Sequence, residues 1–298
     1  MKGIVLAGGA GTRLYPASQP ISKILLPIYD KPMIYFPLST LMLAGIKDRL
    51  IITNEADYDN FIKLLGDGSQ FGLNLFYKIQ YVQKGIADAF IIAEDFIDGD
   101  SSALILGDNI FHGQGFSSIM KHAIEKKSGA TVFGYTVKDP ERFGVVEFNS
   151  SGKAISLEEK PTNPKSNYAV TGLYFYDKNV CKYAKELTPS GRGELEITDL
   201  NKIYLEKGLL NVEILGRGFA WLDTGTHDSM LQASNFVQGM ELNKGVKISC
   251  LEEIAFNKGF ISKSDLLKQI EKYGNNNDYY NYVRQAVEHP DSIALSFM

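Results

Sequence analysis

The chain has 298 residues, 44% of them hydrophobic, and a formal net charge of -4 at pH 7. This composition supports a large buried core, and the negative balance argues against a nucleic-acid-binding protein, because phosphate-backbone binding depends on clustered Lys and Arg. The only cysteines, Cys181 and Cys250, are too few and too distant in sequence for a disulfide framework or a structural zinc site. No segment approaches the roughly 20 apolar residues that span a bilayer, so we expect a cytoplasmic protein with no membrane partner.

Short apolar runs rich in β-formers alternate with runs of helical periodicity through the first half of the chain. Strands are expected at 3–8, 49–54, 73–80, 102–108 and 130–137, and helices at 37–45, 58–66, 86–97 and 116–127. Two of these helices stop at a glycine, Gly45 and Gly66. Such alternation is typical of βαβ units, so we predict a doubly wound α/β fold with a mostly parallel sheet covered on both faces.

The pattern changes at residue 143. Residues 143–161 form two alternating runs about an Asn-Ser-Ser-Gly turn, which is typical of a β-hairpin. Further strands are expected at 169–177, 211–215 and 219–225, with helices at 179–187, 194–207, 226–243, 262–274 and 278–289. We predict a single domain, 1–298, with a core (1–142), a smaller lobe (143–225) that extends the same sheet across its ligand edge, and a helical C-terminal region (226–298).

The loop "LAGGAGTRLYP", residues 6–16, follows the first expected strand. Glycine clusters at this position usually allow a backbone to approach a phosphate. The loop matches neither common phosphate motif, because no Gly-Lys-Ser or Gly-Lys-Thr follows and Leu14 stands where a dinucleotide loop needs its third glycine. Arg13 and Lys23 add positive charge, which favours a triphosphate site over the alternative of a surface turn with solvated cations.

Two aspartates each follow a strand-like apolar run, Asp108 in "LGDN" and Asp223 in "WLDTG". Ligands of parallel sheets bind at the carboxyl ends of strands, where Asp108 and the glycine loop both fall. Carboxylates at two converging strand ends suit Mg²⁺, which keeps several waters and bridges phosphates. For one aspartate alone a helix cap or turn is the alternative, and the second carboxylate favours the metal.

Eight motifs, taken in order, resemble the sugar nucleotidyltransferases, and among them the thymidylyltransferases that act on glucose 1-phosphate. The motifs are "LAGGAGTRLYP", "SKILLPIYDKPMIYFPLSTLMLAGI", "LGDN", "ERFGVVEF", "LEEKP", "VTGLYFYD", "GRGELEITD" and "WLDTGTHDSM". The resemblance runs from residue 3 to about residue 256. It implies a Rossmann-like nucleotidyltransferase core in a homotetramer. It also implies transfer of a thymidylyl group from dTTP to α-D-glucose 1-phosphate, giving dTDP-glucose and pyrophosphate, usually at the entry to dTDP-rhamnose synthesis.

The resemblance also implies the catalytic roles. Asp108 and Asp223 would hold Mg²⁺, while Arg13 and Lys23 would stabilise charge on the triphosphate and on the attacking phosphate. The nucleophile is an ionised phosphate, so no general base is needed.

The nucleotide site implied in the same way includes a glutamine and a glycine that read the base. The side chain of Gln80 and the backbone of Gly85 take these roles, and an amide suits the imide edge of thymine or uracil without separating the two. The whole set is Leu6, Gly8, Gly9, Gly11, Thr12, Arg13, Gln80, Gly85 and Asp108.

The sugar phosphate is expected in the smaller lobe. Glu159 offers a carboxylate for sugar hydroxyls, and Lys160 and Arg192 offer cations for the phosphate; the alternative for this segment is an exposed strand end of paired charges. If the strand continued, Glu159 and Lys160 would face opposite sides, so both can bind only if it ends or twists there. The implied set is Lys23, Gly144, Glu159, Lys160, Val170, Tyr174, Arg192 and Trp221.

Three positions depart from the family pattern. Ile24 and Asp88 stand where glutamine is usual, and Phe143 stands where tyrosine is usual. Loss of a polar group at position 24 and of a hydroxyl at position 143 should alter hydrogen bonds near the ligands without abolishing the reaction. The alternatives to the leading hypothesis are the same reaction with UTP or another sugar 1-phosphate, and a noncatalytic nucleotide-sugar sensor. The presence of Arg13 and Lys23 together with Asp108 and Asp223 disfavours the sensor, because a sensor has no need of a metal-binding pair.

Two segments, "RGFAW" and "KISCLEEIAF", resemble those that form a second nucleotide-sugar site, used for feedback inhibition by dTDP-rhamnose. Packing of the C-terminal helices would explain the same residues equally well. The candidates are Gly113, Arg217, Ser249, Glu253 and Ile254.

Overall fold

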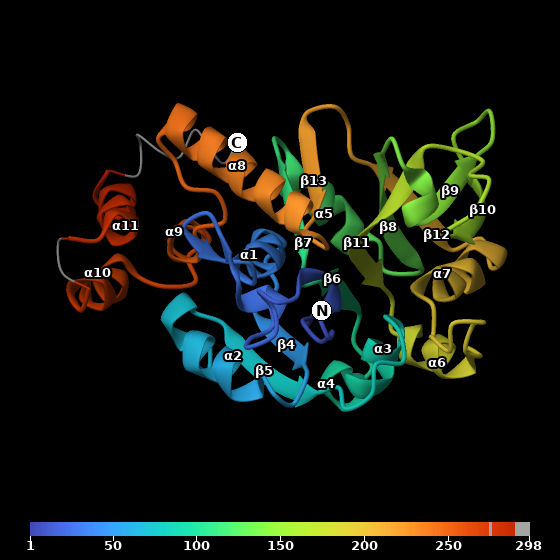
Figure 1. The fold of residues 1–298 in the computed structure, drawn as a ribbon, viewed down its shortest axis with the longest axis horizontal. Helices are drawn as coiled ribbons and strands as arrows, with labels where there is room; N and C mark the ends of the chain where they lie inside the picture. The colour runs from blue at the N-terminus through green and yellow to red at the C-terminus, as the bar shows by residue number, and fades with distance from the viewer. Residues whose placement is uncertain (274–275, 290–298) are drawn as a thin grey trace.

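A computed structural model of the chain describes residues 1–273 and 276–289. A nine-stranded sheet runs through its centre with helices against both faces (Figure 1). One half of the sheet is parallel, in the order β5 (Asn74–Ile79), β4 (Asp48–Thr53), β1 (Lys2–Leu6) and β6 (Ser102–Leu106). The chain adds strands on one side of β1 and then on the other, and open α/β sheets bind ligands at such a switch point.

The other half of the sheet is mainly antiparallel. Strand β11 (Tyr168–Tyr176) runs antiparallel to β6 on one edge and to β8 (Ala130–Thr136) on the other, and β12 (Leu210–Ile214) lies parallel to β8. The predicted hairpin is present as β9 (Gly144–Phe148) and β10 (Ala154–Glu159), and β9 pairs with the start of β11. The predicted doubly wound α/β fold is therefore confirmed, with a mixed half added beyond β6.

One expected strand lies outside this sheet. Residues 219–225, predicted to extend it, form β13 (Phe219–Asp223), which pairs with β7 (Asn109–Gly113) in a separate two-stranded ribbon. An alternating pattern identifies a strand but carries no information about its partner. A second small ribbon joins β2 (Pro27–Ile28) to β3 (Lys31–Pro32).

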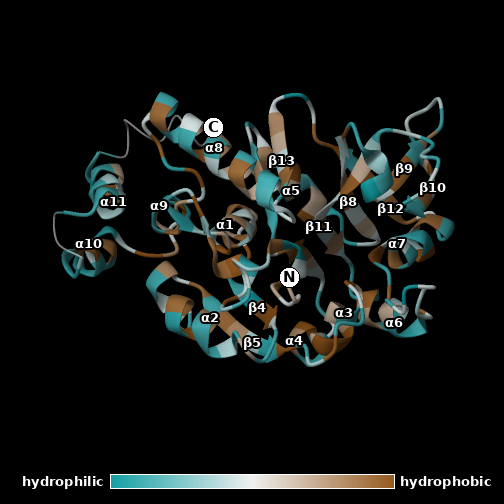
Figure 2. Ribbon diagram, viewed as in Figure 1, coloured by the Kyte–Doolittle hydropathy of each residue, from teal (hydrophilic) through white to brown (hydrophobic). Residues whose placement is uncertain are grey.

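The parallel strands are apolar on both faces because helices cover both. Val5 and Ile51 lie in one hydrophobic cluster, and their neighbours Ile4 and Leu50 lie in the other. The first cluster is covered by α1 (Tyr35–Leu43), α2 (Tyr58–Leu65), α5 (Phe116–Glu125), α8 (His227–Lys244) and α9 (Leu251–Asn257). The second is covered by α3 (Asp88–Ile92), α4 (Glu94–Ile97), α6 (Val180–Glu186) and α7 (Ile197–Glu206). Figure 2 shows the apolar residues gathered along the central strands and α1.

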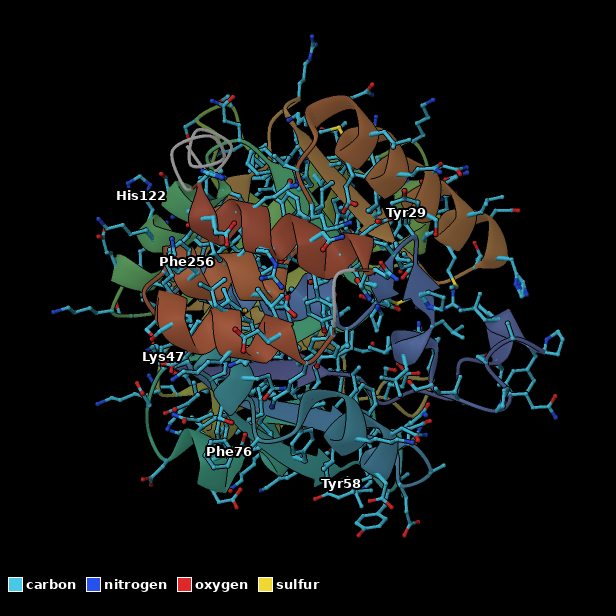
Figure 3. The ribbon with its side chains drawn as sticks, turned by 90° about the vertical axis from the view of Figure 1, so that its left-hand side faces the viewer. Tyr29, Lys47, Tyr58, Phe76, His122 and Phe256 are labelled. Carbon is cyan, nitrogen blue, oxygen red and sulfur yellow. The ribbon has the colours of Figure 1, made fainter. Side chains whose placement is uncertain are left out.

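The predicted helical tail is present. Thr226 caps α8 through a reciprocal capping box with Ser229, and α10 (Lys263–Glu271) and α11 (Asp278–Glu288) close a small apolar cluster over α9. Phe256 lies at the edge of that cluster, between α10 and α11 (Figure 3). The predicted ends at Gly274 and at 290–298 lie outside the described residues. Over the described ranges, every helix is too short or too polar to cross a membrane.

Candidate active site

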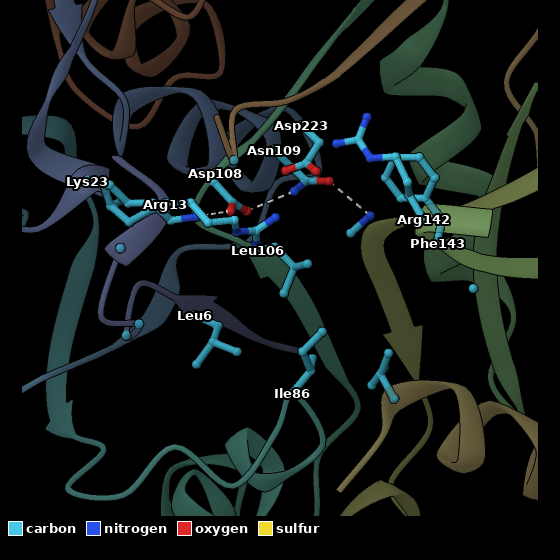
Figure 4. Close-up of a pocket in the computed structure, with 18 of the residues that line it drawn as sticks. Leu6, Arg13, Lys23, Ile86, Leu106, Asp108, Asn109, Arg142, Phe143 and Asp223 are labelled. Carbon is cyan, nitrogen blue, oxygen red and sulfur yellow. Dashed lines mark hydrogen bonds and ion pairs between the residues drawn. The ribbon is translucent and has the colours of Figure 1, made fainter. Parts of the chain in front are cut away.

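A cavity of about 680 Å³ opens at the carboxyl ends of β1 and β6, the switch point of the sheet (Figure 4). Most of the predicted site residues line it: Leu6, Gly8, Gly9, Gly11, Thr12, Arg13, Lys23, Asp108, Gly144, Glu159, Lys160, Val170, Tyr174, Trp221 and Asp223. Three of the predicted nucleotide- and sugar-phosphate-binding residues do not line the cavity: Gln80, Gly85 and Arg192. Gln80 lies beside Gly8 and Arg192 bonds to Glu159, both of which line it.

The glycine loop turns sharply after β1. Gly9 and Gly11 have φ angles of 140° and 60°, which L side chains rarely adopt. Gly11 precedes the short 3-10 turn Thr12–Leu14, and its carbonyl accepts a hydrogen bond from Ser18 Oγ at 2.6 Å. The loop therefore presents backbone and the exposed Arg13 side chain to the cavity, an arrangement that suits an anionic ligand.

The β7–β13 ribbon places the two aspartates side by side. Asp223 is in register with Asn109, the residue after Asp108, and Thr224 donates through N–H and Oγ1 to the Asp108 carbonyl at 3.0 and 2.8 Å. Burial, followed by the negative charge of Asp108, raises the pKa of Asp223 to about 6. The two carboxylates predicted from distant motifs therefore face one cavity (Figure 4).

Cations balance this pair of carboxylates. Lys23 Nζ forms an ion pair with Asp108 Oδ2. Burial opposes the ionisation of Asp108, but the ammonium of Lys23 holds its pKa below the ordinary value. Arg13 favours the ionised form of Asp223, as does Arg142 across the cavity. The site thus holds fixed charges of both signs, as binding of a metal–phosphate complex requires.

Asn109 connects the carboxylates to the main sheet. Its Nδ2 donates to Asp108 Oδ1 at 3.0 Å, and its Oδ1 accepts from Trp221 Nε1 at 2.6 Å and from the Gly172 N–H at 3.1 Å. A Cβ at Gly172 would lie 2.6 Å from this Oδ1, so only glycine allows the approach. Asn109 is 2% exposed, and its three bonds fix the orientation of both Asp108 and Trp221.

The end of β10 resolves the question raised by the sequence about Glu159 and Lys160. Strand β10 ends at Glu159, and Lys160 has a φ of 43°, so the backbone leaves the strand and both residues line the cavity. Glu159 accepts hydrogen bonds from Thr198 Oγ1 at 2.5 Å and from Arg192 Nη2 at 3.2 Å. These hydrogen bonds fix the position of the Glu159 carboxylate in the cavity wall.

The comparisons with known proteins agree with this arrangement. The nucleotidyl transferase family model matches residues 2–239. A glucose-1-phosphate thymidylyltransferase of Neisseria meningitidis is 57% identical over 95% of this chain and 98% of its own length. The chain belongs to the nucleotidyl transferase family, among the glucose-1-phosphate thymidylyltransferases. The Mycolicibacterium smegmatis enzyme of the same name is 53% identical over 97% of this chain and 99% of its own length.

Solved structures extend the comparison. A Bacillus anthracis protein described as a glucose-1-phosphate thymidylyltransferase, in complex with a sucrose, superposes with a TM-score of 0.74 at 44% identity, covering 79% of this chain and 94% of that one. A UDP-glucose pyrophosphorylase with UDP-glucose superposes at a TM-score of 0.70 and 23% identity, covering 80% and 98%. The second likeness concerns the fold alone.

Nucleotidyl transferases generally require a divalent cation, and the donors here fit one. The described residues contain no group of three or more His, Cys, Asp or Glu side chains placed to enclose a metal. Asp108 and Asp223 together provide two hard carboxylates in an open cavity, which leaves the remaining ligand positions to water and phosphate oxygens. An open site of this kind suits a cation that is bound together with its nucleotide.

None of the proposed feedback residues lines this cavity, and they come from three parts of the chain: β7, the segment before β13, and α9 with the residue that closely precedes it. Gly113 ends β7 opposite Phe219, and Arg217 lies exposed just before β13. Glu253 and Ile254 are buried in α9, while Ser249, with a φ of 55°, precedes that helix and bonds to Ser39. Their role in feedback stays a prediction.

Several cavity residues were missed by sequence reasoning. Asn109 had a signal, because it follows Asp108 in the quoted "LGDN" motif. Arg142 stood in "ERFGVVEF" and Thr198 in "GRGELEITD", but a single arginine or threonine within a motif has many ordinary structural roles. Gln83 had no signal beyond its closeness to Gln80.

Proposed function

We propose that the protein transfers a thymidylyl group from dTTP to α-D-glucose 1-phosphate, producing dTDP-glucose and pyrophosphate. The observation that carries the proposal is the single cavity in which the glycine loop, the two adjacent aspartates and the Glu159 side meet. This arrangement supplies a triphosphate site and a sugar-phosphate site within reach of one another. The close relatives that bear the name glucose-1-phosphate thymidylyltransferase support the choice of substrates.

The chemistry needs positioning and charge neutralisation more than proton transfer. A phosphate oxygen of glucose 1-phosphate forms a bond to the α-phosphorus of dTTP, while the bond from that phosphorus to the bridging oxygen of pyrophosphate breaks. The nucleophile is already ionised, so no side chain has to remove a proton. Lys23 and Arg13 bring the two anions together and stabilise the charge that develops on pyrophosphate.

Mg²⁺ is the cation we assign to Asp108 and Asp223. When bound there it would neutralise phosphate charge and polarise the α-phosphoryl group. The chain's own contribution is to hold the two carboxylates together, Asp108 through Lys23 and Asn109, and Asp223 through the register of β13 with β7. Chelation with EDTA should abolish turnover, and added Mg²⁺ should restore it.

On the sugar side, Glu159 would accept hydrogen bonds from hydroxyl groups of the glucose ring, with Lys160 and Arg192 close to the phosphate. Trp221 would form one wall of this pocket, against Phe143 at 5.1 Å between ring centroids. Phe143, where the family usually has tyrosine, supplies ring area but no hydroxyl. The proposal extends to a homotetramer, to a cytoplasmic location and to the first step toward dTDP-rhamnose, which are tested by sedimentation, by localisation in cells and by genetic complementation.

Pyrophosphate release tests the function. The protein should release pyrophosphate from dTTP with glucose 1-phosphate faster than from any pairing with UTP or another sugar 1-phosphate, and a strong UTP preference would overturn the assignment. Asp108→Asn should lower turnover by about 100-fold or more while the protein still folds, because one of the two carboxylates loses its charge. If the protein were a sensor without turnover, both the wild type and Asp108→Asn would bind the nucleotide sugar, and neither would release pyrophosphate.

A further inference from the structure

A carboxylate faces the glutamine that is expected to read the base. Gln80 follows β5 directly, and its Nε2 donates a hydrogen bond to Asp88 Oδ2 at 3.0 Å. Asp88 is the first residue of α3, and both side chains are only 7% exposed. The hydrogen bond therefore joins the residue that is expected to read the base to a buried carboxylate.

The carboxylate decides which way the amide points. A glutamine amide has a donating end and an accepting end of nearly equal size, so its orientation follows from the partners around it. An ionised carboxylate only accepts hydrogen bonds, so Asp88 can be satisfied by the NH₂ end of Gln80 and not by its oxygen. Rotation of the amide by half a turn would place two acceptors against each other in a buried position, which is costly.

The opposite end of the amide lies beside the cavity wall. Gln80 Oε1 lies 3.0 Å from the point that a Cβ on Gly8 would occupy, and Gly8 lines the cavity together with Leu6 and Ile86. Within the described residues Gln80 Oε1 accepts no hydrogen bond. It also differs from the unpaired polar atoms that are completely buried, because it keeps some exposed surface. The Gly85 N–H, five residues further along, likewise meets no acceptor in the described part of the chain. One free acceptor thus lies beside Gly8 in the cavity wall, and one free donor lies next in the chain to Ile86, which lines the cavity.

We infer that Asp88 is a specificity-determining residue, which locks the Gln80 amide with its oxygen toward the base and so selects a pyrimidine imide. Thymine and uracil present a donor at N3 to this oxygen, whereas N3 of cytosine is an acceptor and is repelled. The inference deepens the proposed function and rests on it for the placement of the base. It assigns the rejection of cytosine, and not the choice between thymine and uracil, to Asp88.

The test replaces the carboxylate by its isosteric amide. In Asp88→Asn the new side chain can offer either an oxygen or an NH₂ group, so the Gln80 amide can adopt both orientations. We expect the ratio of kcat/KM for dTTP over dCTP to fall by about 10-fold, on the order of the cost of one mismatched base hydrogen bond. The ratio of Kd values for the two nucleotides, measured by titration calorimetry without sugar phosphate, should fall by a similar factor.

Matched variants separate charge from shape. Asp88→Glu keeps a group that only accepts, so it should keep the wild-type ratio even if its overall rate falls. Asp95→Asn makes the same chemical change in α4, at a side chain that is 76% exposed and pairs with Lys78, and it should leave the ratio unchanged. If Asp88→Asn fails to fold by circular dichroism, Asp88→Ala, which offers no acceptor, carries the same expectation.

Two results would overturn the inference. One is a folded Asp88→Asn, or Asp88→Ala in its place, with the wild-type dTTP to dCTP ratio; the other is an equal loss of that ratio in Asp88→Glu, which would assign the effect to shape. Failure of the proposed function would look different. In that case the wild-type protein would release no pyrophosphate from dTTP and glucose 1-phosphate. The ratio of Kd values for dTTP and dCTP would still test the role of Asp88, because it is measured without turnover.

Discussion

The side-chain amide of Asn109 joins Asp108, Trp221 and Gly172. Its removal should therefore change the free energy of unfolding, the fluorescence of Trp221 and the turnover of the enzyme. In Asn109→Ala the indole of Trp221 and the backbone N–H of Gly172 both lose their acceptor, and Asp108 loses a donor. The site is 2% exposed at this residue, so water does not replace these bonds easily. We expect a folded but weakened protein with a misplaced carboxylate.

The magnitude follows from the number of groups left without a partner. Each buried donor that loses its acceptor costs about 1–3 kcal/mol, so the two donors together cost about 2–6 kcal/mol in the free energy of unfolding. Turnover should fall further than this loss of stability explains. In the wild-type protein the Asp108 carboxylate bonds to the side chains of Lys23 and Asn109, and in the variant only the bond to Lys23 remains. Part of the stability cost disappears if the ribbon shifts to find new partners.

The assay combines urea unfolding with fluorescence, since Trp221 is the only tryptophan of the chain. Emission from the native state should change in Asn109→Ala, and the unfolding midpoint seen by circular dichroism should fall. Asn211→Ala is the control, because Asn211 makes one long bond of 3.3 Å to the Ala130 carbonyl and should cost about 1 kcal/mol or less. Wild-type emission and wild-type stability in Asn109→Ala would refute the assigned role.

Two further predictions concern buried charges. Arg49 is fully buried, its Nε and Nη1 have no partner among the described residues, and burial lowers its pKa to about 9. Replacement by an apolar side chain in Arg49→Met should therefore raise the free energy of unfolding by about 1–4 kcal/mol. A variant that unfolds at a lower urea concentration than wild type would contradict this. Burial raises the pKa of Glu253 from 4.5 to about 7, so the folded state retains a proton through that window and stability should fall by about 3 kcal/mol as pH rises across it. Glu253→Gln should lack this slope, which urea titrations at pH 5 and pH 8 measure against wild type.

The parts of the site that sequence predicts are those in which one short segment carries both the fold and the chemistry. The glycine loop is such a segment, because Gly9 and Gly11 reveal both the turn and the close backbone approach. Asp108 is another, since a carboxylate directly after a buried strand must emerge at the ligand edge of a parallel sheet. In both cases the neighbours that matter lie within a few positions in the chain.

The rest depends on contacts that no local pattern contains. Asn109 bonds to residues 63 and 112 positions away, and the pairing of β13 with β7 spans a similar distance. Glu159 and Lys160 can face the same cavity because Lys160 has a positive φ angle, whereas strand alternation alone predicts that they face opposite sides. Strand direction is equally hidden, because β8 has the same apolar character whether its neighbour β11 runs parallel or antiparallel to it.

The connection at Gly172 explains how two carboxylates outside the main sheet can be held accurately over a cavity that the sheet forms. Val170, Gly172 and Tyr174 alternate along β11, so all three present the same face to the cavity. The middle position has no side chain, and the amide of Asn109 enters that space from β7. The ribbon, which begins just after Asp108 and ends at Asp223, is thereby bonded to β11 in the cavity wall. This glycine–asparagine contact therefore acts together with the short chain connection from β6 to Asp108 in positioning the carboxylates over the cavity.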